Sequence, residues 1–403
     1  MRIVVLDPGF EDISSHHANV NRELCESASA KQTKVLILAS KRLSHIADID
    51  LLSANTSAWF ETPCYTNKLK ALTPEKEEQL ANQFCRELQA AYRAKHITNS
   101  DSLLIHSCFS FHILGIAKWL LHAQNSFAGK ILICGMFYPG KQFVGNADQL
   151  QYFHWYVRYR LAFALLKNAI AETSADVKLA TSCQDYIDAF TACSNMQFML
   201  HPAITYTRPT PRVKQVRKRV ILYIGTLKFD KGIDFLMQCL PDLLSKHPEI
   251  DVFIQFNEES PSASTFSHHG NTLRDLVNKH ANLKVHWEPL SQSEYEQQFA
   301  LSDALVLLYD QAEYKHKTSG LLWDTLRYPH MSLICSDGIW ASNEYIKAGG
   351  EPILFGYNNG EAFIAGIDTW AKMPQTQAKL NTYGKELTSS FASWCCQLIL
   401  PNS

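Results

Sequence analysis

The sequence predicts an α/β protein made of two domains, each built around a parallel β-sheet. The chain has 403 residues, which is too many for one comfortable hydrophobic core and suits two domains. Short apolar runs alternate along it with longer stretches of helical periodicity. A polar break punctuated by prolines divides this alternation into two series. Strands that alternate with helices favour parallel sheets with right-handed crossovers.

The apolar runs define the expected strands, and the periodic stretches define the helices between them. In the first series we expect strands at residues 2–6, 34–39, 102–106, 130–134 and 177–180, and a helix at 74–93. In the second series we expect strands at 220–224, 251–256, 283–287, 304–308, 332–335 and 352–355, and helices at 235–244 and 294–301.

The break between the two series predicts the domain boundaries. Pro202, Pro209 and Pro211 bias the chain toward extended structure, and a basic run at 212–219 leads into the next strand. We therefore expect an N-terminal domain at 1–203, a linker at 204–218 and a C-terminal domain at 219–372. Residues 373–403 are expected to form a helix that packs back on the N-terminal domain.

The overall composition narrows the class of protein. The 38 basic and 39 acidic residues give a formal net charge of −1, so the whole molecule offers no reason to expect nucleic-acid binding. The first apolar run is too short for a signal peptide, and no stretch approaches the ~18–20 apolar residues of a membrane span. The 11 cysteines are scattered, which is typical of free thiols in a reducing compartment. We expect a cytoplasmic protein.

Two segments of the second series contain the residue types expected of a phosphate-binding site. A buried strand runs into Gly225, and Lys231 and Gly232 then open a helix. Glycines let the backbone approach a ligand and an ammonium group neutralises phosphate, although an ordinary strand–helix junction has the same pattern. After the strand at 304–308, Thr318, Ser319 and Gly320 begin a helix whose N-terminus suits a diphosphate. Asp324 lies one turn into that helix, where a carboxylate can bind ribose hydroxyls. The alternative is that Ser319 only caps the helix and that Asp324 is only an acidic residue of its first turn.

Together the two segments resemble the donor domain of family 4 glycosyltransferases. Gly225, Leu227, Lys231 and Gly232 match the family's Gly-Arg-Leu-x-x-x-Lys-Gly motif, and Asp324 takes the place of the second glutamate of its Glu-x7-Glu motif. The resemblance covers residues 220 to about 345. It implies the GT-B fold, in which two Rossmann-like domains face each other across a cleft. It also implies transfer from a nucleoside-diphosphate sugar with retention of configuration.

The resemblance assigns roles to residues of the second domain. The diphosphate would be bound by Gly225, Thr226, Lys228, Lys231, Thr318, Ser319 and Gly320. The nucleoside would be bound by Trp287, Pro289, Leu290 and Asp324, and the donor sugar by Glu313, Tyr314 and His316. Thr226 replaces the family's arginine and His316 its first glutamate, so the sugar end of the site departs from the pattern. We expect a UDP- or GDP-linked sugar as co-substrate and no metal.

The N-terminal domain is expected to bind the acceptor. His106 ends a buried strand, where polar residues face the ligand crevice of a parallel sheet, and it resembles the family's histidine near the anomeric carbon. Gly9, His16 and His17 follow the first strand and would border the acceptor. We assign catalysis to His106 and Lys231, although a hydrogen-bonded structural histidine remains an alternative for His106. The aromatic and basic stretch at 152–160 suits a packed helix, a sugar acceptor stacked on its rings, or contact with the inner face of the membrane.

The predicted activity is transfer of a hexose to an acceptor hydroxyl, in the synthesis of a polysaccharide or glycoconjugate. The expected partners are the donor and a saccharide or glycoconjugate acceptor. Two alternatives share the scaffold: a catalytically silent GT-B partner protein, which Thr226 and His316 favour, and a non-hydrolysing nucleotide-sugar epimerase.

Overall fold

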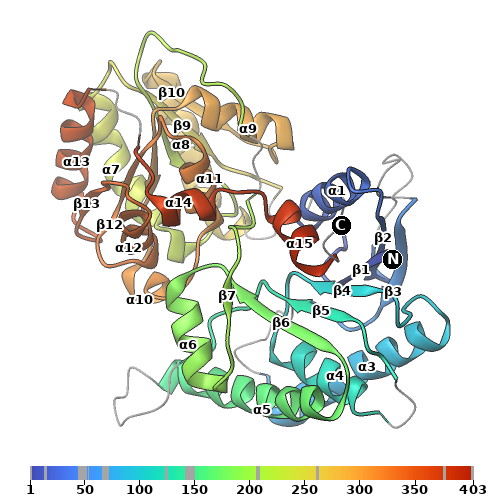
Figure 1. The fold of residues 1–403 in the computed structure, drawn as a ribbon. Helices are drawn as coiled ribbons and strands as arrows, with labels where there is room; N and C mark the ends of the chain where they lie inside the picture. The colour runs from blue at the N-terminus through green and yellow to red at the C-terminus, as the bar shows by residue number, and fades with distance from the viewer. Residues whose placement is uncertain are drawn as a thin grey trace. The chain divides into compact units, whose positions relative to one another are not determined.

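The chain forms two compact units in a computed structural model (Figure 1). Unit 1 comprises Met1–Ile204 with Ser389–Ser403, and unit 2 comprises Thr205–Thr388. The structure describes residues 2–12, 16–43, 52, 54–65, 72–122, 126–140, 150–205, 209–259, 263–374 and 378–400.

Unit 1 is built on a parallel sheet with the order β3-β2-β1-β4-β5-β6-β7. Its strands are β1 (Arg2–Asp7), β2 (Lys34–Ser40), β3 (Thr56–Phe60), β4 (Ser102–Ile105), β5 (Lys130–Ile133), β6 (Asp176–Thr181) and β7 (Met199–Leu200). The strand order reverses direction at β1, which has β2 on one side and β4 on the other. This reversal places the topological switch point of unit 1 at the carboxyl ends of β1 and β4.

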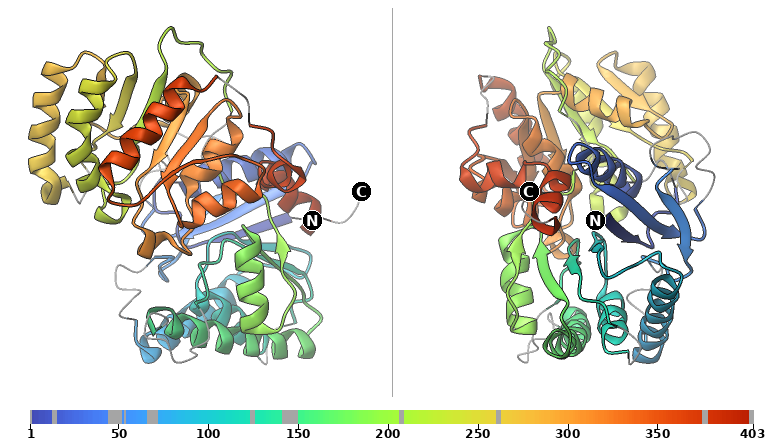
Figure 2. Two further views of the ribbon diagram at one scale, coloured as in Figure 1. Left: turned by 90° about the vertical axis from the view of Figure 1, so that its left-hand side faces the viewer. Right: turned by 45° about the vertical axis from the view of Figure 1, so that its right-hand side comes forward.

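Helices cover both faces of the sheet in unit 1 (Figures 1 and 2). They are α1 (His16–Ser29), α3 (Pro74–Arg93), α4 (Ser110–Leu120), α5 (Leu150–Glu172), α6 (Gln184–Ser194) and α15 (Phe391–Ile399). Helix α15 contacts α1, and its Phe391, Cys395 and Ile399 pack into the cluster that includes Val5 and Ile37. Helix α4 contacts both α3 and α5. The apolar runs of β1, β4 and β5 are buried because layers of helices cover them.

Unit 2 is built on a second parallel sheet, with the order β10-β9-β8-β11-β12-β13. Its strands are β8 (Arg219–Tyr223), β9 (Asp251–Gln255), β10 (Leu283–His286), β11 (Ala304–Leu307), β12 (Ser332–Ser336) and β13 (Ile353–Phe355). Here the order reverses at β8, so the switch point lies at the carboxyl ends of β8 and β11.

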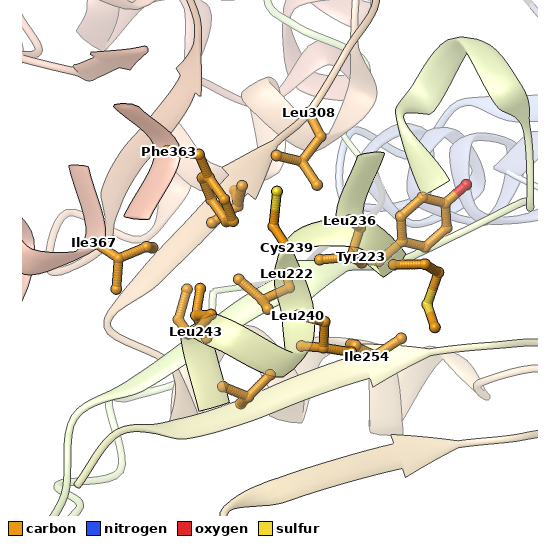
Figure 3. Packing of buried hydrophobic residues seen from close by; sticks show 14 of the residues in the cluster. Leu222, Tyr223, Leu236, Cys239, Leu240, Leu243, Ile254, Leu308, Phe363 and Ile367 are labelled. Atoms are coloured by element: carbon orange, nitrogen blue, oxygen red, sulfur yellow. The ribbon is translucent and has the colours of Figure 1, made fainter. Parts of the chain in front are cut away.

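The core of unit 2 joins strands to helices on one face of the sheet (Figure 3). The helical elements of the unit are η3 (Phe229–Lys231), α7 (Ile233–Lys246), η4 (Ala263–Phe266), α8 (Ser267–Lys279), α9 (Gln292–Leu301), α10 (Gln311–Tyr314), α11 (Gly320–Arg327), α12 (Trp340–Lys347), α13 (Gly360–Lys372) and α14 (Thr382–Leu387). Leu236 and Leu240 of α7 are fully buried in one cluster with Ile254 of β9 and Ile367 of α13. Because α7 begins directly after Gly232, this packing fixes the loop that precedes it.

The predicted α/β architecture with parallel sheets is confirmed, and each predicted strand overlaps an observed one. The strands β3 and β7 were not predicted. The single helix expected at the C-terminus is wrong: two short helices, α14 and α15, begin at the side-chain caps Asn381 and Ser390. The expected return of the C-terminus to the N-terminal domain is confirmed for α15, because Ser389–Ser403 group with unit 1, whereas residues 378–388 belong to unit 2.

The basic segment before β8 is attached to unit 2 rather than forming a free linker. Arg212 pairs with Asp303, and the Lys218 ammonium donates to the carbonyls of Trp370, Ala371 and Met373 at 2.9, 3.0 and 2.7 Å. Residues 206–208 of the expected linker lie outside the described residues. None of the described helices is long and apolar enough to cross a membrane.

Candidate functional site

Two glycines fix the shape of the loop from Gly225 to Gly232, because their backbone angles would strain any other residue. Gly225 has φ +94° and Gly232 has φ +76°, values in the left-handed region that L side chains rarely adopt. A Cβ at Gly232 would lie 2.0 Å from the carbonyl oxygen of Leu308, so the loop touches the end of β11 through bare backbone. The first predicted donor segment therefore lies at the switch point of unit 2.

Two polar side chains that sequence reasoning missed hold this loop in place. The Tyr223 hydroxyl donates to the Thr226 carbonyl at 3.1 Å and accepts from the Lys228 amide at 3.0 Å. Gln255, at the end of β9, accepts from the Gly225 amide at 2.8 Å and donates to the Glu288 carbonyl at 3.4 Å. Gln255 thus links the ends of β8, β9 and β10. Its position at a strand end was the signal that would have identified it.

Lys231 is a cation with no counter-anion of its own. Its side chain is half-buried, and none of the hydrogen bonds or ion pairs among the described residues involves its ammonium group. A Cβ at Gly225 would lie 3.3 Å from Nζ, so the group points to the open face of the glycine turn. Burial, and then repulsion from Lys228, lower the pKa of Lys231 to about 8, while the attraction of Asp230 works in the opposite direction. Lys317 donates to Asp230 at 2.9 Å and so uses part of that negative charge.

The second predicted donor segment lies against the first. Asp310 donates its amide to the Asp230 carbonyl at 2.9 Å, and its carboxylate accepts from the first amides of α10. Tyr309 stacks on Tyr314 with ring centroids 4.0 Å apart. The Ser319 hydroxyl lies 3.1 Å from the Tyr309 hydroxyl and makes no side-chain cap on α11. Ser319 is the N-cap residue of α11 by position, but its side chain does not accept from the first amides of the helix. Whether Ser319 is only an N-cap or also binds the diphosphate stays a prediction.

The other residues predicted to bind the donor differ in how accessible they are. Asp324 has no exposed surface, and the Tyr295 hydroxyl donates to its Oδ2 at 2.9 Å. To bind ribose, Asp324 would have to replace this hydrogen bond with one from a ribose hydroxyl. Tyr314 is buried against Tyr309, with the Lys317 ammonium 4.3 Å above its ring. Glu313 and Lys228 are exposed, and Thr318 and His316 are half-buried, as is Gly320.

The loop predicted to bind the base follows β10. Arg274 lies over the Trp287 ring at 4.5 Å, and its guanidinium donates to both oxygens of Glu258 at 2.7 and 2.6 Å. Pro289 is exposed and Leu290 is half-buried. The Trp287 ring is therefore held by protein contacts, while the following residues are accessible.

In unit 1 the predicted residues meet around one buried carboxylate, Asp7, which ends β1. His17 Nδ1 lies 2.7 Å from Oδ1, and His106 Nε2 lies 3.2 Å from Oδ2. Asn21 donates to Oδ2 at 2.7 Å, and the Gly9 amide donates to Oδ1 at 3.2 Å. Burial alone would raise the pKa of Asp7, but His17 and His106 hold it well below its ordinary value. The carboxylate explains why these residues lie together, and neither Asp7 nor Asn21 was assigned from sequence.

A second layer of hydrogen bonds surrounds the Tyr65 hydroxyl. It lies 3.1 Å from His16 Nε2, 2.9 Å from His17 Nε2 and 3.2 Å from Ser107 Oγ. Because Nδ1 of His17 faces Asp7, the other nitrogen of the same ring, Nε2, faces the Tyr65 hydroxyl. The Tyr65 hydroxyl thus joins His16, His17 and Ser107 in one hydrogen-bonded group.

Two groups of side chains among the described residues have ligand atoms close enough together for a metal ion. One is Asp7, His17 and His106, and the other is Asp234, His268 and His269 of unit 2. In each group the carboxylate already accepts a short hydrogen bond from a histidine, His17 at 2.7 Å and His269 at 2.6 Å. Hydrogen bonding accounts for both arrangements, and the expectation of no metal stays a prediction.

No protein-family model matches the sequence, and no curated protein matches it by sequence. Solved structures do match the fold over almost the whole chain. A sucrose-phosphate synthase from Thermosynechococcus elongatus is 15% identical, with a TM-score of 0.62, and the match covers 99% of this chain and 98% of that one. An α,α-trehalose-phosphate synthase (UDP-forming) from Burkholderia xenovorans, in complex with glucose-6-phosphate, is 8% identical with a TM-score of 0.61, covering 99% of each chain.

A third neighbour is a trehalose-6-phosphate synthase studied for glycosyltransfer with retention. It is 11% identical with a TM-score of 0.57, and the match covers 96% of this chain and 94% of that one. At sequence identities of 8%, 11% and 15%, the structural similarity shows the fold alone. Both units of the protein therefore have the Rossmann-like topology of the GT-B class. The finer likeness to family 4 is not shown by these neighbours.

Proposed function

We propose that this protein is a glycosyltransferase that uses a nucleoside-diphosphate sugar, with the diphosphate held at the switch point of unit 2. The observation that carries the proposal is the ammonium of Lys231, which has no partner among the described residues and lies beside the bare backbone of Gly225. An anion at this place would supply the missing counter-charge and reach the N-terminus of α11, which lacks a side-chain cap. The UDP-forming neighbour favours a UDP-linked donor.

In the proposed reaction, the bond between the anomeric carbon and the diphosphate breaks while an acceptor hydroxyl forms the new glycosidic bond. Negative charge then builds on the leaving diphosphate. Lys231 and Lys228, with the backbone of Thr318, Ser319 and Gly320, would stabilise it through fixed positive charge and dipoles. The acceptor proton leaves with the diphosphate. We propose retention because the donor motifs resemble those of family 4 enzymes, and a neighbour is described as transferring with retention.

The remaining roles are part of the same proposal. Asp324 would bind ribose after exchanging its bond to Tyr295, and residues 287–290 would bind the base. Glu313 and His316 would contact the donor sugar. In unit 1, His106 would take part in catalysis from its position beside Asp7. The product would be a polysaccharide, a glycoconjugate or a related saccharide made in the cytoplasm.

Contact with a membrane surface is a secondary proposal. The aromatic stretch of α5 is largely interior, since Tyr159 is fully buried and Arg158 pairs with Glu77 at 3.1 Å. The side chains of Tyr152 and Phe153 lie outside the described residues. Val157 and Leu161 are exposed on the same helix and are the candidates for such a contact. Loss of co-sedimentation with anionic vesicles on Leu161→Glu would support it, and the absence of sedimentation by the wild type would rule it out.

A thermal-shift panel of nucleoside diphosphates and nucleotide sugars tests the donor site. A ligand at ~100 times its dissociation constant stabilises a protein by about 2.7 kcal/mol, which is easily seen as a rise in Tm. We expect one base to stabilise the wild type and Lys246→Ala, an exposed lysine at the end of α7, but not Lys231→Ala. A flat response to every nucleotide would sink the proposal.

Product analysis then separates the two alternative functions. The departures at Thr226 and His316 are what favour a silent partner protein, which would bind nucleotide but release none from a nucleotide sugar. An epimerase would convert the sugar of the donor without needing an acceptor. We expect nucleoside diphosphate to be released only when an acceptor is present.

A further inference from the structure

Three aromatic rings form a surface at the carboxyl edge of the unit 1 sheet. We call Tyr65, Phe109 and Phe137 the aromatic shelf; they follow β3, β4 and β5. Phe109 and Phe137 are stacked with centroids 4.1 Å apart, and Tyr65 meets both edge-on at 6.4 and 6.2 Å. Phe109 is buried, while Phe137 is 40% and Tyr65 is 42% exposed. Two large rings therefore present apolar surface to solvent at the edge where parallel sheets bind their ligands.

Backbone contacts fix the position of the shelf. Gly135 has φ +62°, and a Cβ there would lie 1.8 Å from the carbonyl oxygen of His106. Cys108 and Met136 form a parallel bridge directly beside it. The segment that carries Phe137 is thus pressed against the end of β4 at a position that only glycine allows.

The polar groups next to the shelf are hydroxyls and imidazoles. Tyr65 carries the hydroxyl that lies within 3.2 Å of His16, His17 and Ser107. Burial, and then the neighbouring His17, lower the pKa of His16 to about 3, so this imidazole is neutral at physiological pH. An apolar ring surface beside neutral donors and acceptors matches a sugar, whose C–H face stacks and whose hydroxyls hydrogen-bond.

The Arg158 guanidinium next to the shelf forms an ion pair with a buried carboxylate. Arg158 lies 5.4 Å over the ring of Trp155, which contacts Phe109, and its Nε is 3.1 Å from the buried Glu77 carboxylate. Phosphate recognition calls for charge-assisted hydrogen bonds, above all from arginine. Because Arg158 pairs with Glu77 and the His16 imidazole is uncharged, neither of these two described groups offers an unpaired positive charge to a phosphate.

We propose that the aromatic shelf binds the acceptor through an uncharged sugar ring, so that the protein glycosylates a neutral saccharide and not a sugar phosphate. The role of the shelf as an acceptor site rests on the proposed function. Binding of a sugar to the shelf can be measured without turnover. The proposal separates this chain from the neighbour of the same fold that was solved with glucose-6-phosphate.

Binding is tested first, with maltose and glucose-6-phosphate as probes in saturation-transfer difference NMR. We expect saturation transfer to maltose with the wild type, a loss of about tenfold in affinity with Phe137→Ala, and no change with Leu161→Ala, a 64% exposed apolar residue of α5. Binding of glucose-6-phosphate alone, or equal maltose binding by Phe137→Ala, would overturn the proposal. Because this experiment needs no donor, a failure here is distinct from a flat nucleotide panel.

Turnover is tested next, with the nucleotide sugar that stabilises the wild type. We expect maltose to stimulate nucleotide release and glucose-6-phosphate to have no effect. Phe137→Ala should raise the KM for maltose about tenfold, with the KM for the donor unchanged, because the shelf contacts the acceptor only. A donor that turns over with glucose-6-phosphate and not with maltose would contradict the proposal while leaving the glycosyltransferase assignment intact.

Discussion

The two units place polar residues at equivalent switch points, but the charge at these points differs. At the end of β1, the Asp7 carboxylate is surrounded by His17, His106 and Asn21, which donate to it. At the end of β8, Lys231 has no partner among the described residues, and its nearest charged neighbours include Lys228. Unit 1 therefore neutralises its buried charge internally, whereas unit 2 leaves a positive charge for a ligand to neutralise.

This difference shows that topology fixes where a ligand binds and side chains determine which ligand it is. Both sheets reverse their strand order next to the candidate residues. Only the second gathers cations beside a glycine turn, which suits a diphosphate. The first presents neutral polar groups beside exposed rings, which suits a saccharide. The likeness to solved structures shows the shared fold, and the residues carry the assignment of each half.

The largest expected effect is the loss of the shared carboxylate in unit 1. Asp7→Ala leaves His17, His106 and Asn21 without their buried acceptor, so we expect the free energy of unfolding to fall by about 3–5 kcal/mol. The pKa of Asp7 is lowered in the folded state, so its contribution is present at neutral pH and lost as pH falls through the folded pKa. Urea denaturation measures the change. Asp176→Ala, at an exposed carboxylate that begins β6, is the control; equal effects would contradict internal neutralisation.

The second-largest expected effect is a loss of stability on substitution in the glycine turn of unit 2. It shows whether this turn is as rigid as its contacts indicate. Gly232→Ala places a methyl group 2.0 Å from the Leu308 carbonyl oxygen at φ +76°, and we expect a loss of about 2–3 kcal/mol. The matched control is Gly356→Ala, where the nearest atom would be 3.8 Å from the new Cβ. Thermal and urea unfolding compare the two variants. Equal stability would mean that the loop moves freely and does not preform a phosphate site.

The sequence predicted the architecture because continuous apolar runs mark strands buried on both faces. The strand β3 escaped prediction because its residues, Thr56–Phe60, include only one that is fully buried. The two-residue strand β7 has no pattern to detect. The C-terminal segment was misread because its apolar residues share a helical face, while the caps at Asn381 and Ser390 divide it.

The candidate site was predicted in part, and the missed residues share a cause. Gly225, Lys231 and Gly232 follow one strand, so a single segment reveals them. Tyr65 and His17 are 48 positions apart, and only the folded chain brings the segment after β3 next to the start of α1. A lone polar residue such as Tyr65 carries no local pattern, and only tertiary structure shows which groups it joins.

A smaller effect concerns the stability of the unliganded protein. Because the folded-state pKa of Lys231 is about 8, below the ordinary value of 10.5, the charged group destabilises the fold fully below pH 8. This penalty disappears as pH rises above the unfolded pKa. We expect Lys231→Met to raise the unfolding free energy by about 1–2 kcal/mol at pH 7, after allowance for partial solvation. Calorimetry at pH 7 and pH 10 checks this: the gain should shrink at the higher pH. A loss of stability at pH 7 would show that Lys231 has a structural partner.

The smallest effect links the same group to nucleotide binding. The protonated form of Lys231 attracts the diphosphate, so affinity for UDP should weaken about three- to tenfold as pH rises from about 7 to 9.5 through the pKa near 8. A bound anion raises the pKa of the ammonium, and binding near pH 8 should therefore take up protons. Titration calorimetry in buffers of different ionisation enthalpy measures this uptake, which should persist in Lys246→Ala and vanish in Lys231→Ala. If the wild type takes up no protons, the diphosphate does not contact Lys231, and the contrast between the two units loses its functional meaning.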